Sequence, residues 1–338
     1  MYNPFIQSLR AGSNPAALAK FVNHMSAKRA APLGMRPWAF SPQELTSMME
    51  ASHLHYRPFS LSKKTGGERK IHAPEPALKM VQWSLAPFFR TMFTPAICSF
   101  GFERGRGIVE NARVHVGQDW VLNADIQDFF PSISRPRLKG LFQSDWGPHV
   151  SPYMADSLAR LVTHQGRLPQ GAPSSPVLTN LVAANLDIRL EGLARHFGCR
   201  YSRYVDDLTF SAAGPGALRE VLPRLLRIVA SEGFDLNPKK TRVQPVSMRQ
   251  GVTGLVLTSQ KSGAEPGVSV PREFRRQTRA MLHAWRAHGL DRAAEQVGQS
   301  SEEFALSTQG RIAHICHVRC SPEADRMKAE LRQLWPSV

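Results

Sequence analysis

Residues 200–212 read RYSRYVDDLTFSA, and the centre of this stretch, Tyr204-Val205-Asp206-Asp207, decides the fold that we expect. Two adjacent carboxylates stand between β-branched and aromatic flanks, which predicts a hairpin with both acids at its tip. A second stretch, NADIQDFF at 123–130, places Asp125 at the end of the apolar strand WVLNADI (120–126). Taken alone, an Asp-Asp pair is usually a solvated turn, and Asp125 could equally be a strand-end cap.

Charge and hydropathy narrow the class of partner. The 338 residues include 43 Lys and Arg against 27 Asp and Glu, a formal net charge of +16. A chain this basic is expected to meet a polyanion, either nucleic acid or an anionic membrane surface. No run approaches the roughly 18 apolar residues of a membrane span, and no signal-peptide core is visible. The composition therefore favours nucleic acid and predicts no membrane partner.

The four cysteines are sparse and do not suggest a disulfide framework, which suits a reducing cytoplasm. His314, Cys316, His317 and Cys320 lie close together and raise the question of zinc. The segment GRIAHICHVRC has no second ligand pair at metal spacing, so we favour a helix end over a zinc site.

The remaining pattern divides the chain into elements. Residues 1–43 contain no Asp or Glu, which fits an organellar transit peptide or, as we prefer, a basic arm lying on nucleic acid. Ser41 to Glu44 form a capping box that begins a helix through Ala51. Extended pieces at 56–74 have Gly66 and Gly67 where a hairpin tip would be. Helices are expected at 76–92, 150–164, 176–197 and 216–232, a strand at 251–259, and helices after the loop EPGVSVP.

Carboxylates on separate strands are what a polymerase needs to hold two Mg²⁺ ions. One ion activates the attacking 3′-OH, and the other neutralises the triphosphate and the leaving pyrophosphate. Asp125 and Asp206 would be the shared ligands, with the Ile126 carbonyl and Asp207 assisting.

Three stretches in this order, DIQDFF, LPQGAPSSPVLTN (168–180) and YVDD, resemble reverse transcriptases. More narrowly, the chain resembles the bacterial retron type. LPQGAPSSP looks retron-like, Asn111-Ala112-Arg113-Val114-His115 matches an Asn-Ala-x-x-His element, and Val252-Thr253-Gly254 matches a Val-Thr-Gly element. The resemblance runs from about Tyr56 to the C-terminus.

The resemblance implies an α+β right-hand polymerase fold with fingers, a palm bearing an antiparallel sheet, and a helical thumb. We expect an N-terminal basic helical extension at 1–50, fingers at 51–120, the palm with part of the fingers at 121–260, and the thumb at 261–338. It also implies an RNA-directed DNA polymerase that copies a dedicated structured non-coding RNA into branched RNA-linked single-stranded DNA. Another bacterial reverse transcriptase, conventionally primed or template-free, and an idle RNA-binding scaffold are the alternatives.

The family pattern assigns the nucleotide site. Lys63 or Lys64 and Arg69 would contact the incoming dNTP, although a basic hairpin is usually just solvated. Gln170 and Gly171 would lie beneath the nascent base pair. Phe130 would exclude a ribose 2′-OH, unless it is simply core like its neighbour Phe129.

Other matched residues would act on nucleic acid. Tyr204 would lie on the template–primer backbone, and Lys240 (or Lys239) would protonate pyrophosphate or contact phosphate. Asn111, His115, Val252, Thr253 and Gly254 are implicated in RNA recognition, or else in local packing and capping. The arginines at one helical face would follow a duplex or RNA stem, unless they are a solvated face: Arg272, Arg275, Arg276, Arg279 and Arg286.

The partners implied are a structured RNA template and primer, its DNA product, dNTPs and a separate effector protein in antiphage defence. The expected location is the bacterial cytoplasm. An idle scaffold is disfavoured because clustered acids on an RNA-facing surface repel phosphate unless a metal is present.

Overall fold

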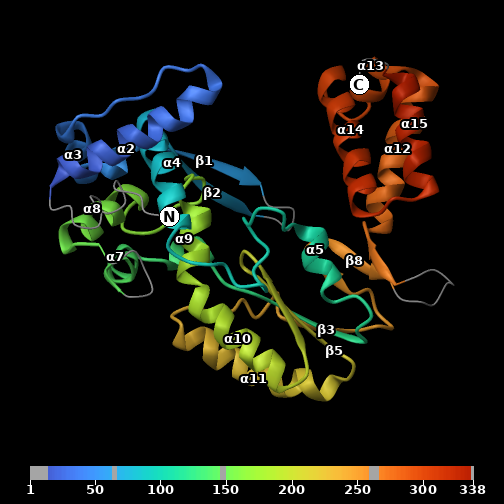
Figure 1. Ribbon diagram of the computed structural model, residues 1–338. Helices are drawn as coiled ribbons and strands as arrows, with labels where there is room; N and C mark the ends of the chain where they lie inside the picture. Colours follow the sequence, from blue (N-terminus) through green and yellow to red (C-terminus); the bar gives the residue numbers. More distant parts are fainter. Residues whose placement is uncertain (1–13, 63–66, 145–149, 259–265, 336–338) are drawn as a thin grey trace.

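The computed structural model describes residues 14–62, 67–144, 150–258 and 266–335 (Figure 1). Two clusters of buried apolar side chains divide the chain. The larger cluster runs from Leu18 to Phe234, and the smaller joins Val109, Ala112 and Val121 to residues between Val252 and Leu331. The mixture of helices and antiparallel sheets agrees with the expected α+β class.

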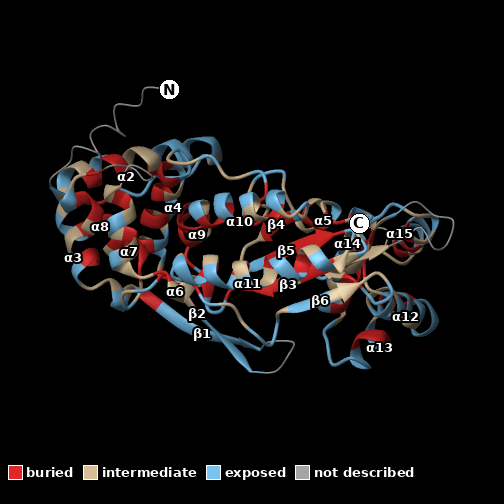
Figure 2. Cartoon of the chain, turned by 90° about the horizontal axis from the view of Figure 1, so that it is seen from below, coloured by how far each residue is buried: buried red, intermediate tan, exposed pale blue. Residues whose placement is uncertain are grey.

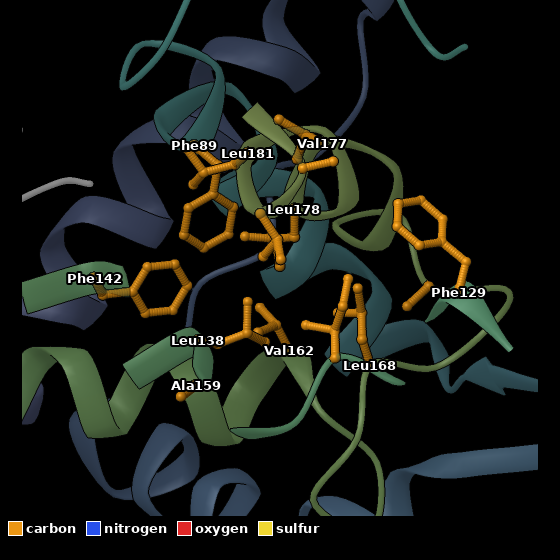
Figure 3. Packing of buried hydrophobic residues seen from close by; sticks show 14 of the residues in the cluster. Phe89, Phe129, Leu138, Phe142, Ala159, Val162, Leu168, Val177, Leu178 and Leu181 are labelled. Atoms are coloured by element: carbon orange, nitrogen blue, oxygen red, sulfur yellow. The ribbon is translucent and has the colours of Figure 1, made fainter. Parts of the chain in front are cut away.

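Helices that lie far apart in the sequence pack together in the larger cluster. The capping box at Ser41 is present and begins α3 as expected. Phe89 of α4 stacks on Phe142 of α7 with ring centroids 5.3 Å apart, and Leu178 packs beside them (Figure 3). The helices of this part are α2 (Pro15–Ala30), α3 (Pro42–Glu50), α4 (Pro76–Arg90), α6 (Phe129–Ser132), α7 (Arg135–Gln143), α8 (Pro152–Val162) and α9 (Ser175–Val182), with short 3-10 turns η1 (Ala31–Leu33) and η2 (Ser52–His55). Two later helices, described below with the central sheet, also contribute to the cluster.

An antiparallel hairpin extends from this helical cluster. Strand β1 (Tyr56–Ser62) pairs with β2 (Glu68–Pro74) from Tyr56 opposite Pro74 to Ser62 opposite Glu68. Of the two glycines expected at the tip, Gly67 has a positive φ of 83°, and Gly66 lies outside the described residues. Most of the hairpin is exposed (Figure 2).

The central sheet has four antiparallel strands in the order β4 (Arg200–Tyr204), β5 (Asp207–Ala212), β3 (Trp120–Asp125) and β6 (Arg242–Pro245). Side chains alternate across β3, so Leu122 and Ala124 enter the larger cluster while Val121 enters the smaller one. Helices α10 (Ala184–His196) and α11 (Pro215–Ser231) lie along the sheet (Figure 1). The single helix expected at 176–197 is two helices, α9 and α10, divided at Ala183.

A second sheet corrects one expectation. Residues 251–259 were expected to form one strand, but β7 (Gly251–Val252) and β8 (Leu255–Thr258) form a hairpin, extended by β9 (Gly267–Ser269). The turn residues Thr253 and Gly254 have positive φ values of 47° and 81°, as a two-residue hairpin turn requires. The turn packs on α5 (Ile108–Arg113), where the Thr253 hydroxyl donates to the Ile108 carbonyl at 3.2 Å.

The C-terminal helices form a bundle on the opposite side of the molecule from α2–α4 (Figure 1). Its interior includes Leu282, Trp285, Ile312 and Met327. The bundle consists of α12 (Arg272–His288), α13 (Leu290–Glu295), α14 (Ser301–Val318) and α15 (Pro322–Leu334). Within the described ranges, every helix is too short or too polar to cross a bilayer.

A buried histidine ties α5 to the β4–β5 hairpin. The His115 ring lies 2.7 Å from the Ser211 hydroxyl through Nδ1 and 2.8 Å from the Ser202 hydroxyl through Nε2. Its exposed fraction is 0%, and burial, aided by the charge of Arg200, lowers the pKa of His115 to about 3. The imidazole is therefore neutral and bridges the two strands.

We predict that this bridge makes stability sensitive to acid. Because the folded-state pKa lies below the unfolded value of about 6.5, the stabilisation is complete above pH 6.5 and is lost as the pH falls toward 3. Thermal unfolding from pH 8 to pH 5 should show His115→Gln less stable by about 1–3 kcal/mol at pH 8. The difference should narrow at pH 5. Equal slopes for variant and wild type would contradict the bridge, and exposed His283→Gln is the control.

Candidate active site

The antiparallel pairing of β3 and β5 brings the three expected aspartates to one end of the central sheet. Asp125 stands opposite Asp207 in the strand register. Beyond that pair, the backbone N–H of Ile126 donates to the carbonyl of Asp206 at 2.9 Å. The Asp125 side chain is nearly buried at this end, so carboxylates distant in the chain converge at one place.

These carboxylates carry like charges, and among the described residues only Asp125 of the three forms an ion pair. Desolvation at the turn, followed by the charges of Asp206 and Asp125, raises the pKa of Asp207 to about 6. Burial and then the charge of Asp125 raise the pKa of Asp206 as well. Asp207 is exposed to solvent, so a dissolved cation can reach the carboxylates and relieve their repulsion.

Lys240 provides the nearest positive charge. The Asn237 N–H donates to the Asp125 carbonyl at 2.8 Å, and the next turn carries the Lys240 ammonium to 2.7 Å from Asp125 Oδ2. Burial alone would lower the pKa of Lys240, but the hydrogen bond to Asp125 and the three carboxylate charges raise it. Lys239 is exposed, and within the described residues its backbone N–H bonds locally to Asn237 Oδ1 at 3.1 Å. Of the two lysines considered, Lys240 meets the acids.

The donor set suits a hard divalent cation. Its side-chain ligands are carboxylate oxygens, and Mg²⁺ is commonly held by one or two carboxylates together with substrate phosphates and water. Among the described residues, no three His, Cys, Asp or Glu side chains form a complete ligand cluster by themselves. The Lys240 ammonium beside Asp125 stands where a counter-cation is needed. The residues present therefore fit a metal that shares its coordination with substrate.

The β1–β2 hairpin faces this end of the sheet. Arg69 of β2 is near enough for its charge to lower the pKa of Asp206 against the larger upward effects. The loop after α8 is attached to the same strand, because the His72 N–H donates to the Gln170 carbonyl at 2.9 Å. Gly171 has φ +111°, and a Cβ there would lie 2.8 Å from Ile71 Cγ2, so only glycine fits. Lys63 and Lys64 lie outside the described residues.

The two phenylalanines after Asp125 differ in burial. Phe129 is buried and packs on Phe234 with centroids 5.4 Å apart. Phe130 is half-buried and meets Phe102 edge-on at 6.2 Å. Tyr204 is also half-buried, at the end of β4 opposite Asp207. Phe130 and Tyr204 are thus both partly accessible to solvent.

Three residues expected to recognise RNA are buried. Asn111, His115 and Val252 each have an exposed fraction of 0%. Their burial favours the alternative of local packing, and recognition of RNA through this region stays a prediction. Within the described part of the chain neither amide atom of Asn111 has a hydrogen-bond partner. Thr253 and Gly254 form the turn that joins α5 to the second sheet.

The arginines of α12 are partly neutralised by acids that sequence analysis missed. Arg275 and Arg279 both pair with Glu323 of α15, at 3.2 Å and 3.5 Å. Arg286 pairs with Glu330 of α15 at 3.3 Å, and Arg276 with Glu273 on its own helix at 3.0 Å. Arg272, Arg276 and Arg279 border a cavity of about 420 Å³ with Glu323. No spacing pattern along α12 could reveal partners that come from another helix.

A buried arginine beside the Asp pair was also missed. Arg203 has an exposed fraction of 0% and pairs with Asp187 of α10 at 2.6 Å. The available signal was a charged residue inside a strand otherwise suited to burial. Two residues further along the chain, Val205 has φ +61°, a conformation that β-branched residues rarely adopt.

Comparison with known proteins points in one direction. Residues 61–257 match the family described as reverse transcriptase (RNA-dependent DNA polymerase). The Retron Mx162 reverse transcriptase of Myxococcus xanthus is 36% identical over 271 residues, covering 72% of this chain and 56% of the relative. The chain thus spans little more than half of that protein.

Two further matches differ in strength. The Retron Ec86 reverse transcriptase of Escherichia coli is 34% identical over 247 residues, covering 72% of this chain and 74% of the relative. A telomerase structure from Candida albicans, in complex with a fragment of telomeric RNA, aligns with a TM-score of 0.43 at 10% identity over 82% of this chain and 63% of that chain. At that score the likeness to telomerase is distant and supports no conclusion.

We predict that Asp207→Asn stabilises the metal-free protein. At pH 8 the wild-type carboxylate is ionised despite its raised pKa, so the folded state carries a penalty that the amide removes. Thermal unfolding in a chelator should give a melting temperature higher by roughly 2–6 °C. Added Mg²⁺ should raise the melting temperature of the wild type more than that of the variant. A variant that melts lower in the chelator would contradict the repulsion.

Proposed function

The chain belongs to the reverse transcriptase family, in its retron type, and from this premise we propose that it is an RNA-directed DNA polymerase. Its template would be a dedicated structured RNA, copied into branched RNA-linked single-stranded DNA. The observation that carries the proposal is the register that sets Asp125 opposite Asp207 and joins Ile126 to Asp206. Carboxylates placed this close together destabilise the folded state unless they bind a cation.

The right-hand polymerase fold of the family gives the elements their proposed tasks. Residues 51–120 would be fingers, 121–260 the palm with part of the fingers, and 261–338 the thumb. The four-stranded sheet would then form the palm, and the β1–β2 hairpin would be part of the fingers. Residues 1–50 would be a basic helical extension.

Asp125 and Asp206 would hold two Mg²⁺ ions, with Asp207 and the Ile126 carbonyl assisting. Bound there, the ions would supply charge stabilisation for the attacking and leaving oxygens of phosphoryl transfer. The protein's own part is to keep these oxygens at one place. The carboxylates already repel one another there, which favours exchange of Lys240 for a divalent cation.

Lys240 would hold a proton close to the reacting phosphates. Its raised pKa keeps the ammonium charged, so once displaced from Asp125 it could donate a hydrogen bond or a proton to the leaving pyrophosphate. Alternatively, the Lys240 ammonium would contact phosphate without donating a proton, which requires the same positive charge.

The dNTP would lie between the hairpin and the aspartates. Arg69 is within electrostatic reach of Asp206 and would bind the triphosphate together with Lys63 or Lys64. Gln170 and Gly171, joined to β2 through His72, would form the floor. Phe130, accessible on one side, would exclude the 2′-OH of a ribonucleotide.

The bundle would bind the RNA or its duplex with DNA. The exposed guanidiniums of Arg272 and Arg276, with Arg275 and Arg279, would meet phosphates. Tyr204 would lie on the template–primer backbone. We further propose a separate effector protein as a partner, with a role in antiphage defence in the bacterial cytoplasm.

The deciding experiment pairs incorporation with linkage analysis. With the cognate RNA and dNTPs, the wild type should make DNA joined to the RNA through a 2′,5′ bond. Asp206→Asn should lower incorporation by on the order of 10³-fold or more. The variant loses a metal ligand, and with it the several kcal/mol by which a bound metal ion stabilises the charge of the transition state. RNA binding should stay near the wild-type value. Equal synthesis on unrelated primed templates would favour a conventionally primed enzyme, and undiminished incorporation by the variant would end the catalytic assignment.

We also predict that Glu323 restrains RNA binding by holding two arginines. Glu323→Gln should tighten RNA binding and steepen its salt dependence, since freeing Arg275 and Arg279 adds up to about two phosphate contacts. Replacing Arg275, Arg276 and Arg279 with Gln should weaken binding and flatten that dependence. Filter binding between 50 and 300 mM salt measures both. Glu302→Gln, an exposed acid on α14, is the control, and an unchanged slope in the triple variant would contradict phosphate binding.

A further inference from the structure

The turn that carries Asp206 and Asp207 is built around a strained residue. Val205 has φ +61°, and its branched side chain makes this left-handed conformation unfavourable by itself. Such a conformation persists only where surrounding contacts determine it. The contacts on Val205 come from two directions, one inside its own hairpin and one from the segment 98–101.

From inside the hairpin, the guanidinium of Arg203 holds the Val205 carbonyl. Nη1 donates to this oxygen at 3.0 Å and to Asn180 Oδ1 at 3.1 Å. Nε and Nη2 donate to the two carboxylate oxygens of Asp187 at 2.7 Å and 2.6 Å, and Nη2 also donates to Ser99 Oγ at 2.9 Å. All five guanidinium N–H groups are therefore used.

From the other side, Gly101 presses against the turn. A Cβ on Gly101 would lie 2.6 Å from the Val205 nitrogen and 2.7 Å from its Cγ2. The segment is fixed to β4 by two backbone bonds of 2.8 Å, Arg203 N–H to the Cys98 carbonyl and Phe100 N–H to the Arg203 carbonyl. Asn180 Nδ2 donates to the Gly101 carbonyl at 2.9 Å, so one amide joins both supports.

The two peptide groups that flank Asp206 are thus both held. Arg203 donates to the carbonyl of Val205, the residue before Asp206. The backbone N–H of Ile126 donates to the carbonyl of Asp206 itself at 2.9 Å. Fixing both peptides fixes the direction in which the Asp206 Cα–Cβ bond leaves the chain. Asp207, next in line, enters β5 opposite Asp125.

A buried ion pair is a poor means of gaining stability alone. Removing both charges of Arg203 and Asp187 from water costs about as much as their attraction returns, and apolar residues of similar volume often serve as well. What apolar residues cannot supply is a directed donor to the Val205 carbonyl. The network's geometry therefore points to a task beyond packing.

We propose that Arg203 is a positioning residue for catalysis, whose guanidinium, anchored by Asp187, Asn180 and Ser99, holds the Val205 carbonyl and so aims Asp206 and Asp207. The proposal rests on the proposed polymerase function. Arg203 is buried beneath the turn and touches no substrate. Its effect on the reaction passes through the backbone of the turn.

Arg203→Lys is the first test. Lysine keeps the charge beside Asp187 but cannot span the acid and the Val205 carbonyl together. We expect a folded protein with template–primer affinity within about twofold of wild type, kcat lower by about 10–100-fold, and a raised half-saturating Mg²⁺ concentration. A merely structural role would lower the melting temperature and leave kcat and the Mg²⁺ midpoint of the folded protein unchanged. That result would overturn the proposal.

Val205→Gly provides a rescue. Glycine adopts φ +61° without strain, so the turn depends less on the guanidinium. In a double-mutant cycle, the loss of kcat caused by Arg203→Lys should be smaller in the Val205→Gly background by at least about threefold. Independent effects would count against the link between Arg203 and the turn.

Gly101→Ala approaches the turn without touching any charge, and it decides the matter if Arg203→Lys does not fold. Its methyl group would displace Val205, so kcat should fall and the Mg²⁺ midpoint rise in a protein that still binds RNA. Gly140→Ala in α7, where a Cβ meets nothing within 4 Å, is the matched control. Wild-type kcat for Gly101→Ala would refute the proposal. If the wild type itself makes no DNA, the proposed function fails instead, so the two failures are distinguishable.

Discussion

The pairing of β3 with β5 is the constraint on which the rest of this molecule depends. It sets Asp125 against Asp207 at the end of a sheet whose strands are mostly buried, and it does so with backbone hydrogen bonds that are insensitive to side-chain charge. The carboxylates would separate if their own repulsion decided the matter. Packing of β3 into both apolar clusters, through Leu122 on one face and Val121 on the other, keeps the strand where it is.

The groups around this end of the sheet divide into those that compensate charge and those that fix the backbone. Lys240 neutralises Asp125 directly. His115 joins β4 to β5 with an uncharged ring, and Arg203 places its charge against Asp187, away from Asp125, Asp206 and Asp207. In the described part of the chain, the carboxylates of Asp206 and Asp207 are thus left without an ion-pair partner. Sites that must bind cations commonly retain such a cost in stability.

Sequence reasoning succeeded where the signal was local. The capping box at Ser41, the hairpin at 56–74 and the strand ending in Asp125 each follow from short-range patterns, and the structure has them. It failed where a residue's partner lies elsewhere in the chain. Strand propensity ran through Thr253 and Gly254 because nothing local announces that two positive φ values will form there. His115 and Asn111 have polar side chains typical of surfaces, and only the packing of α5 on two sheets buries them.

The attachment of the loop at Gln170 to strand β2 limits how the hairpin can move. The bond from His72 and the glycine-only contact between Gly171 and Ile71 join the loop to the strand. Bending of the hairpin at this level would break that bond and open a void beneath Ile71. Any movement of the hairpin therefore either carries the loop along or has its pivot nearer the tip than Ile71. The part of the hairpin beyond Ile71 can then shift while the surface at Gln170 and Gly171 stays in place.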